Sequence, residues 1–452
     1  MKISALRNLW TPFSLSRPVL SKLARVSIVI IFAASIHGCQ RPVQEPITLT
    51  FLDPEWSHDA RERSLLSDAA LQEFTQKTGI AVKHLPAPET SPSQLALIRD
   101  LLQKKAPTPD LYGIDVIWPG MLSEYLLDMK PYFATELSTA DPEVLGNYTV
   151  QGRLVAVPYH ANSGVLFYRT DLLVKYGYKE PPKTWEEMEK MALRIQAGER
   201  AKGQKDFWGF VWPGAGSEGL LCNALEWQFD EGGGRIIEAD RKISVNNPAT
   251  IRTWERAARW IGWISPPGVL SYQEWDSSNA FLNSERAAFA RSWTSDYFLR
   301  HPLEQAIQER VGETSMPRGE SARVGTLGGF GLAISRNSAH IPEAVRLVQF
   351  LLDKEGQLER EQLRSPFPRH PELYEMPKIL NVNVAQTKSG NTADVVVRPS
   401  TVAASKYDEV SQAYTEALHS VLTGKAKASN AAADLEKRLV AITGFETGPP
   451  AN

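Results

Sequence analysis

Apolar and polar residues alternate at the start of the folded region, and apolar residues then recur at helical spacing. This change of period repeats along the first part of the chain. It predicts strands at 47–52, 80–84 and 111–118, with helices at 61–77 and 95–104 between them. Strands that alternate with helices indicate βαβ units and a mainly parallel sheet. The fold class predicted for this region is therefore α/β.

The second part of the chain is mostly helical after two more strand-like runs at 154–158 and 164–168. Thr184-Trp-Glu-Glu187 is a capping box, which predicts a helix that continues through about Ala201. Further helices are predicted at 254–263, 343–354, 407–422 and 431–442. Two α/β lobes of about 200 residues each fit this pattern.

Residues 1–38 have the pattern of an export signal. Five basic residues and no acidic residue accompany an uncharged run of eleven residues from Val26 to Ile36. An apolar run of about 7–15 residues after a basic start is typical of a signal peptide, whereas a spanning helix needs about 20. A buried N-terminal helix is the alternative interpretation.

The end of this signal resembles a bacterial lipobox. Gly38 stands directly before Cys39, although His37 departs from the small residue that is usual at its position. The resemblance implies that Cys39 carries a lipid and becomes the new N-terminus, with residues 39–46 as a polar leash. We therefore expect an exported, membrane-tethered protein in the periplasm or at the cell surface.

Composition excludes several other classes. The chain of 452 residues has a formal net charge of −2, which argues against nucleic acid as its main partner. Two cysteines cannot form a disulfide framework, and Cys222 lies in an apolar helical stretch that predicts an inert core residue. No P-loop, no G-x-G-x-x-G motif after a predicted strand and no metal-ligand spacing is present, so we expect neither cofactor nor metal.

The sequence shows no pairing of a nucleophile with a base. Ala215-Gly-Ser-Glu-Gly219 is similar to a serine-hydrolase elbow with its first Gly replaced. That elbow needs a strand before it, whereas Trp212-Pro213-Gly214 precedes here, so a loop is the better interpretation. We therefore expect no catalytic residues and a protein that is not an enzyme.

Aromatic, amide-bearing and glycine residues collect at predicted strand ends. In an open α/β sheet, ligands bind beyond the carboxyl ends of the strands. A flat ring offers a stacking surface, and glycines let backbone amides approach a ligand closely. Any one Trp is more often a core residue, but without an Arg/Lys cluster the set favours a neutral polyol over an anion. The set is Asp115, Trp118, Tyr159, Asn162, Trp293, Gly328 and Gly329.

A series of segments, in their order and spacing, resembles the family 1 extracellular solute-binding proteins, which capture sugars for ABC importers. Within that family the chain is most similar to the trehalose/maltose-binding branch. The segments are residues 114–119, 152–158, 166–173, 182–187, 207–212, 224–227, 265–268, 326–329 and 398–400.

The resemblance implies a two-lobed periplasmic-binding-protein fold with a hinge. One lobe would contain residues 46–155 and 290–340, and the other residues 160–288 and 345–445. A disaccharide or short oligosaccharide would bridge the lobes and favour the closed form. The partners implied are ABC permease subunits with a separate ATPase, and the protein itself is expected to be a monomer.

The resemblance also implies roles for single residues. Asp115 would accept hydrogen bonds from sugar hydroxyls, Asn162 would bind from the hinge side, and Trp293 would stack on a pyranose ring. The remaining implied residues would line the same cleft or reach into it: Leu327, Gly328 and Arg398, with Glu55 and Trp56 as weaker matches. Two other classes stay open, namely a secreted glycan hydrolase and a sugar-sensing lipoprotein without transport.

Overall fold

The structure is a computed structural model that describes residues 46–54, 66, 68–88, 90–133, 142–293, 310–353 and 395–451. These residues belong to one unit, Pro46–Asn452. The predicted signal peptide, Cys39, and nearly all of the predicted leash lie outside the described residues, as do Glu55 and Trp56.

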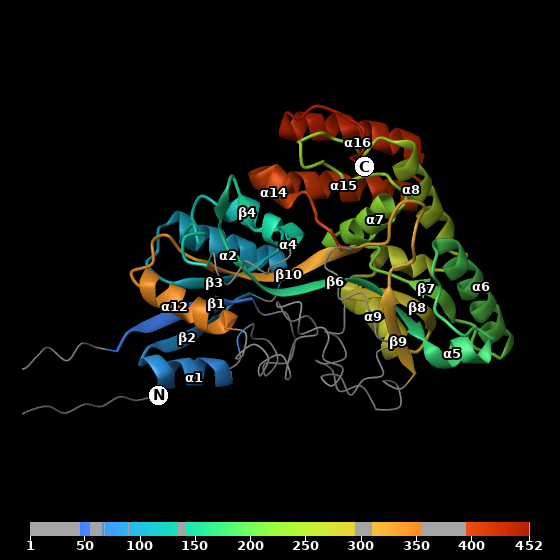
Figure 1. Ribbon diagram of the computed structural model, residues 1–452. Helices are drawn as coiled ribbons and strands as arrows, with labels where there is room; N and C mark the ends of the chain where they lie inside the picture. Colours follow the sequence, from blue (N-terminus) through green and yellow to red (C-terminus); the bar gives the residue numbers. More distant parts are fainter. Residues whose placement is uncertain are drawn as a thin grey trace, which may run out of the picture. The chain divides into compact units, whose positions relative to one another are not determined.

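A nine-stranded sheet organises the described residues, in the order β2-β1-β3-β10-β6-β8-β7, with β11 added to β10 and β9 added to β6 (Figure 1). A separate two-stranded sheet contains β4 (Thr149–Val150) and β5 (Arg153–Leu154). The strands of the large sheet are β1 (Thr48–Asp53), β2 (Ala81–Pro86), β3 (Leu111–Asp115), β6 (Val157–Arg169), β7 (Trp208–Val211), β8 (Ala287–Trp293), β9 (Val311–Ser315), β10 (Gly325–Ile334) and β11 (Val395–Val396).

The strand directions confirm the α/β class and correct one detail of it. β1 runs parallel to β2 and β3, and β7 runs parallel to β8, as βαβ units require. In contrast, β10 is antiparallel to β3 and β6, and β6 is antiparallel to β8 and β9. The sheet is therefore mixed rather than mainly parallel.

The strands predicted at 154–158 and 164–168 are not separate, because residues from Val157 onward form one strand, β6, and Leu154 belongs to β5, so this prediction was wrong. The residues between the two runs are polar or small and show no clear alternation, which is why the pattern separated them. In the structure they pair with β10, where Gly328 lies opposite Asn162 and Leu327 opposite Ser163. Pairing with a neighbouring strand thus extends β6 through a stretch that has no strand pattern of its own.

The described residues contain a helix for each one that the sequence predicted, mostly with other ends, and residues 61–65 and 67 of the predicted helix 61–77 lie outside the described residues. Residues 407–422 form α15 as predicted, whereas the predicted strand at 111–118 ends at Asp115. The helices are α1 (Asp68–Thr78), α2 (Ser91–Gln103), α3 (Pro119–Leu122), α4 (Pro142–Asn147), α5 (Thr170–Lys175), α6 (Trp185–Ala201), α7 (Glu218–Asp230), α8 (Pro248–Trp260), α9 (Glu274–Leu282), α12 (Ile341–Leu352), α14 (Ser400–Ala403), α15 (Tyr407–Leu422) and α16 (Ala428–Thr443), with 3₁₀ turns η1 (Pro267–Ser271) and η4 (Ala404–Lys406).

Side-chain caps explain where α6 and α8 begin. The Glu187 amide donates to Thr184 Oγ1 at 3.2 Å, which confirms the predicted start of α6. The helix α8 begins earlier than predicted, because Asn247 Oδ1 accepts from the amides of Ala249 and Thr250 at 3.0 Å each. Pro248 then occupies the first turn, where a missing amide hydrogen costs nothing.

Tryptophan rings fill much of the core. Trp185, Trp212, Trp227 and Trp260 pack against one another and Phe210, with ring centroids 5.2–6.4 Å apart and mostly edge-to-face geometry. All five side chains are buried, and such packing adds to the stabilisation from apolar burial itself. These rings join α6, α7, α8 and β7 into one packed layer.

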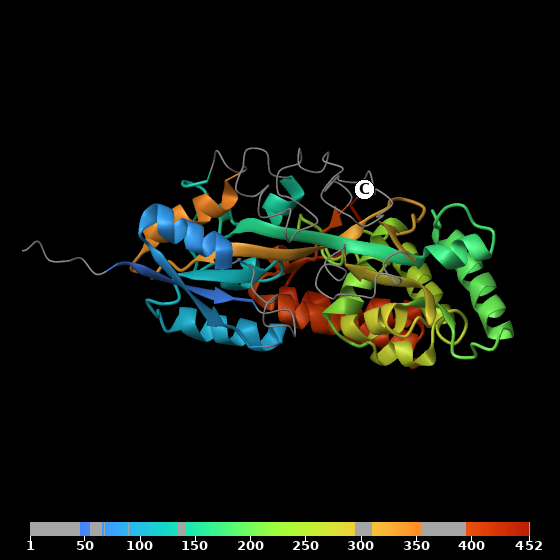
Figure 2. The same ribbon diagram turned by 90° about the horizontal axis from the view of Figure 1, so that it is seen from below.

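The sheet has two ends that two long strands connect (Figure 2). We call β1, β2 and β3 the first sheet half, which contacts α1, and β7, β8 and β9 the second sheet half, which contacts α5, α6 and α9. β6 runs through both, since it pairs with β10 up to Ser163 and with β8 and β9 only from Gly164 onward, and β10 pairs with both β3 and β6. The lobe boundaries stay a prediction. β8 pairs with β7 and β6, β9 pairs with the end of β6, and α12 packs on α1 and β10.

Candidate functional site

The strand register brings together side chains from four strands near the middle of β6 and β10. Asn162 of β6 lies opposite Gly328 of β10, and Trp293, the last residue of β8, lies opposite Gly164 of β6. Asp115, the last residue of β3, pairs with Phe330, two positions along β10 from Gly328. Residues that are far apart in the sequence thus meet where the two long strands pass between the sheet halves.

Asn162, Gly328 and Trp293 are in close contact. A Cβ atom on Gly328 would lie 2.1 Å from Asn162 Oδ1 and 2.8 Å from Trp293 Cζ3, so only glycine fits between them. Asn162 Oδ1 is buried and has no hydrogen-bond partner within the described part of the chain. The Trp293 side chain remains partly exposed. The three residues therefore offer a ring and an unused acceptor at one place.

Gly329 requires a backbone that other residues rarely adopt. Its φ is +122°, and a Cβ atom there would lie 2.0 Å from the carbonyl oxygen of His160. Its own carbonyl accepts a hydrogen bond from the amide of Val116 at 3.1 Å. The predicted glycine pair thus has a structural reason, since it lets β10 lie directly against β6 at this point.

Arg398 joins three elements around the end of β3. Its Nη1 donates to Glu218 Oε1 of α7 at 3.0 Å, and its Nη2 donates to the carbonyl oxygen of Leu327 at 3.2 Å. Nη2 also lies 3.9 Å from Asp115 Oδ1. The guanidinium is nearly buried, and its Nε has no hydrogen-bond partner among the described residues. Arg398 is therefore placed between the ends of β3, β10 and α7.

Glu218 is a site residue that sequence reasoning missed. Besides Arg398, it accepts hydrogen bonds from the hydroxyl groups of Tyr407 and Ser411, both on α15. The segment 215–219 was interpreted as a loop, whereas Ser217 is the N-cap of α7 and Glu218 its first residue. An acidic residue in the first turn of a helix is a recognisable signal, and it could have pointed to Glu218.

Burial dominates the electrostatics of Asp115. Loss of solvent raises the pKa of its carboxyl, and the nearby Arg398 only partly opposes that rise. Asp115 Oδ1 accepts a hydrogen bond from the amide of Ile117 at 3.1 Å, which holds the carboxyl at the end of β3. Burial next to Asp115 also raises the pKa of Tyr148. The site therefore contains a carboxyl that protonates more readily than one in water.

Comparison with known proteins decides the family. The family model described as bacterial extracellular solute-binding protein matches residues 69–386. The chain belongs to this family. It is 37% identical over 427 residues to a probable ABC transporter-binding protein of Deinococcus radiodurans, and the match covers 93% of this chain and 98% of the relative.

Solved structures of solute-binding proteins have the same fold. The maltose-bound MalE3 of T. maritima is 29% identical, with a TM-score of 0.76 over 88% of this chain and 100% of that chain. A solute-binding protein of Thermotoga lettingae bound with α-D-tagatose is 19% identical, with a TM-score of 0.74 over 88% of this chain and 100% of that one, which shows the fold alone. The predicted two-lobed periplasmic-binding-protein fold is confirmed by this similarity.

The other predicted site residues of this solute-binding protein occupy different environments. Trp118 is 1% exposed and belongs to the hydrophobic core. Tyr159 is partly buried and also packs against the core. Leu327 is buried as well, and it contributes its carbonyl oxygen to Arg398. The sequence pattern cannot separate these positions from Trp293, because all of them lie in or beside strands.

Cys222 has the environment that the sequence predicted for a core residue. Its side chain is 1% exposed in α7, and burial raises the pKa of its thiol to about 12. Its carbonyl oxygen accepts a hydrogen bond from Thr326 Oγ1 at 2.8 Å. Cys222 thus helps to join α7 to β10 rather than offering a reactive thiolate.

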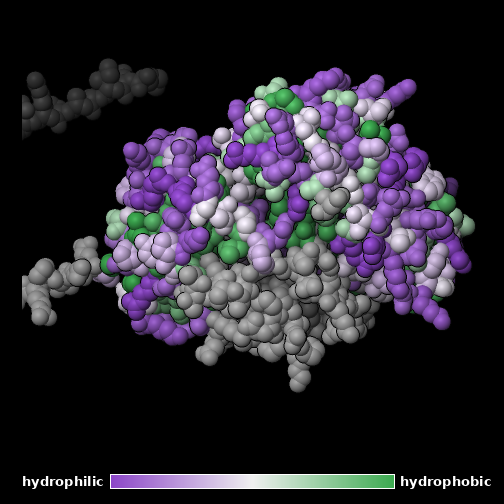
Figure 3. Space-filling view, turned by 45° about the horizontal axis from the view of Figure 1, so that its top comes forward, coloured by the Kyte–Doolittle hydropathy of each residue, from purple (hydrophilic) through white to green (hydrophobic). Residues whose placement is uncertain are grey.

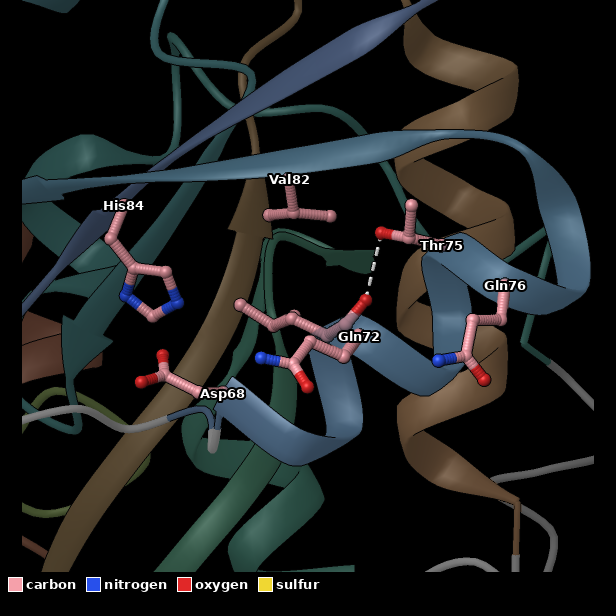
Figure 4. Close-up of a pocket in the computed structure, with 7 residues that line it drawn as sticks. Asp68, Gln72, Thr75, Gln76, Val82 and His84 are labelled. Carbon is pink, nitrogen blue, oxygen red and sulfur yellow. Dashed lines mark hydrogen bonds between the residues drawn. The ribbon is translucent and has the colours of Figure 1, made fainter.

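A hollow lies away from these residues, between α1 and β2 (Figure 4). Its volume is about 420 Å³. Five of its seven lining residues are polar and none carries a Trp, Tyr or Phe ring, and His84 Nδ1 lies 3.0 Å from Asp53 Oδ2. The hollow therefore lacks the stacking surface that distinguishes the Trp293 region. The lining residues are Asp68, Leu71, Gln72, Thr75, Gln76, Val82 and His84.

The described residues contain no group of three or more His, Cys, Asp or Glu placed to hold a metal ion. In the same part of the chain, no helix has both the length and the apolar character needed to cross a membrane.

Hydrophilic side chains cover most of the coloured part of the face shown in Figure 3, and hydrophobic ones gather toward its middle.

Proposed function

We propose that this solute-binding protein captures a disaccharide or short oligosaccharide of the trehalose/maltose type for an ABC importer. The observation that carries the proposal is the contact of Asn162, Gly328 and Trp293, with Asp115 and Arg398 beside them. A partly exposed indole ring next to polar groups suits a sugar, which has apolar ring faces and a rim of hydroxyl groups.

Unused polar atoms support a hydroxyl-bearing ligand. Asn162 Oδ1 and Arg398 Nε are buried without a hydrogen-bond partner in the described residues. Buried polar atoms without partners cost free energy, so a ligand that supplies a donor to Asn162 and an acceptor to Arg398 would recover it. Sugar hydroxyl groups do both, because each can donate and accept.

Similar proteins support the same ligand class. T. maritima MalE3 is described with bound maltose. The Deinococcus radiodurans relative is described as a probable ABC transporter-binding protein, which supports the transport role. Placement in the trehalose/maltose branch rests in addition on the segments around Asp115, Leu327 and Arg398. The permease subunits and a separate ATPase would be other chains, as no Walker motif occurs in this sequence.

Lobe closure is the proposed mechanism, with β6 and β10 as the connection between lobes. The pairing of β8 with β7 and of β9 with the end of β6 supports a division in which these strands move together, while α12 moves with α1. This division differs from the predicted boundaries, which place residues 290–340 in the first lobe. A sugar between the lobes contacts both only in the closed form, so it shifts the equilibrium toward closure. Affinity in the micromolar range corresponds to about −8 kcal/mol, which several hydrogen bonds and one stacked ring can supply.

The lipid anchor is proposed from residues 1–46 alone. Export followed by lipid attachment at Cys39 would tether a monomer at the membrane, in the periplasm or at the cell surface. Mass spectrometry of the protein from membranes should find no residue before Cys39 and an added acyl mass. An intact Met1 end would contradict the anchor without affecting the sugar site.

Sugar binding is tested by calorimetry of the purified protein against trehalose, maltose, maltotriose, tagatose and ribitol. We expect micromolar binding of at least one of the first three and no cleavage of the bound sugar after long incubation. Hydrolysis products on chromatography would overturn the binding-only function. Binding of tagatose or ribitol alone would overturn the disaccharide specificity.

A further inference from the structure

An ion pair between Arg291 of β8 and Glu226 of α7 is completely enclosed next to the site. Both side chains are 0% exposed. Arg291 Nη2 donates to Glu226 Oε1 at 2.6 Å, and Arg291 Nε donates to Oε2 at 3.2 Å. This two-pronged geometry fixes the plane of the guanidinium as well as its position.

The ion pair is held against both long strands. The amide of Thr326 in β10 donates to Glu226 Oε1 at 3.0 Å. On β6, a Cβ atom at Gly164 would lie 1.9 Å from Glu226 Oε1 and 2.5 Å from Arg291 Nη2, so the pair packs directly on the backbone. The guanidinium therefore has little freedom to move relative to the strands that carry Asn162 and Gly328.

The same guanidinium covers one side of the Trp293 ring. Arg291 Cζ lies 4.1 Å from the centroid of the indole. Arg291 Nη1 is buried and has no hydrogen-bond acceptor among the described residues, and the ring is a neighbour that can interact with its positive charge. With one ring face taken by Arg291 and the ring edge against Gly328, a ligand that stacks on Trp293 has to use the opposite face.

We propose that Arg291, fixed by Glu226, is a positioning residue that sets the orientation of Trp293 and decides which indole face a saccharide meets. The inference rests on the proposed function for its ligand, but the orientation of Trp293 can be tested without any ligand. Arginine suits the task because its planar group pairs with a carboxylate at its edge and stacks on a ring with its face. Lysine would keep a positive charge beside Glu226, but its ammonium group has no planar face to stack on the ring.

Fluorine NMR of protein labelled with 5-fluorotryptophan tests the orientation directly. The chain has 12 tryptophans, and Trp293→Phe assigns the Trp293 resonance by its loss. We expect R291K, which keeps the charge beside Glu226, to shift or broaden that resonance and leave most of the others unchanged. E226Q should shift the Trp293 resonance in the same direction by a smaller amount. If R291K fails to fold, E226Q is the variant that tests the proposal. An unchanged Trp293 resonance in the folded variant overturns the proposal.

A matched control exists elsewhere in the chain. Arg200 Cζ lies 4.2 Å from the ring centroid of Trp208, nearly the same contact as that of Arg291 with Trp293. R200K should move the Trp208 resonance, assigned with Trp208→Phe, and leave that of Trp293 in place. If R200K moves the Trp293 resonance as much as R291K does, the shift reports a general loosening and the proposal is overturned.

Maltose titration then separates this inference from the proposed function. R291K should weaken maltose binding about tenfold when Trp293 is present. In a Trp293→Ala background it should weaken binding no further, because Arg291 would act only through the ring. An equal further loss in that background overturns the positioning role. A wild-type protein that does not bind maltose contradicts the maltose ligand, and the fluorine resonance alone then decides the role of Arg291.

Discussion

Two arginines beside the site, Arg398 and Arg291, each pair with a carboxylate on α7, but water reaches only one of the pairs. Glu218, the partner of Arg398, keeps a side chain that is 31% exposed. Glu226 and Arg291 are both 0% exposed. The first carboxylate is shared among Arg398, Tyr407 and Ser411, whereas the second holds one guanidinium with both oxygens.

The difference in solvent exposure gives the two arginine–carboxylate pairs different roles. A pair that water reaches contributes little to stability, and its donors can exchange between the carboxylate and a ligand. An enclosed pair cannot exchange partners, and loss of one member leaves a buried charge without compensation. We therefore expect Arg398 to act in ligand binding and Arg291 to act in the arrangement of the site.

The largest expected effect is on stability, from Arg291→Met. The free energy of unfolding should fall by about 3–5 kcal/mol, because Glu226 is left buried and unpaired. Urea denaturation measures this change. Arg398→Met should cost clearly less, and replacing both Glu226 and Arg291 by Met should recover much of the loss. If Arg291→Met and Arg398→Met lower the free energy of unfolding equally, the two ion pairs do not differ in their contribution to stability.

Trp293→Ala should have the largest effect on binding. We expect a loss of about 2 kcal/mol or more in sugar affinity, since the variant removes the ring face and the apolar wall beside Asn162. Calorimetry gives the affinity and thermal melting gives the stability. Trp208→Ala, which also removes a ring covered by an arginine, should leave affinity unchanged. A Trp293→Ala protein that melts much lower and binds normally would make Trp293 a core residue.

Arg398→Ala should weaken sugar binding by roughly 1–3 kcal/mol, because ligand hydroxyl groups lose a charged donor. Glu218→Gln should cost less, on the order of 1 kcal/mol, since Arg398 keeps an acceptor but loses the opposite charge. Ser411→Ala is the control, as it removes one donor to Glu218 and leaves the Arg398 contact in place. Unchanged affinity in both Arg398→Ala and Glu218→Gln would mean that this pair is as structural as the enclosed one.

The smallest effect is a pH dependence at Asp115. Burial raises its pKa in the folded protein above the ordinary value of about 4, so folding favours its protonated form. The contribution of Asp115 to stability therefore falls as the pH rises from about 4 to the higher folded pKa. Asp115→Asn removes this fall, so its melting temperature relative to wild type should be higher at pH 7 than at pH 4. An equal difference at both pH values would contradict the raised pKa.

Local patterns in the sequence were sufficient for most elements and for the choice of residue types. Helix α15 has the predicted bounds, and Thr184 caps α6 as predicted, because helical periodicity and capping act over only a few residues. Asp115, Asn162 and Arg398 were chosen from strand ends and family segments. The structure brings Asn162 to Gly328 and Trp293, and Arg398 to Asp115.

Contacts between distant segments were decided only by the tertiary structure. Trp118 and Trp293 both follow or end a strand, yet one is in the core and the other is partly exposed, since exposure depends on neighbours that the local pattern does not contain. The sequence itself determined which residue types are available at the candidate site. Glu226 pairs with Arg291, 65 positions away, because α7 and β8 pack together. The residues near Arg291 in the sequence do not indicate which carboxylate its buried guanidinium will bind.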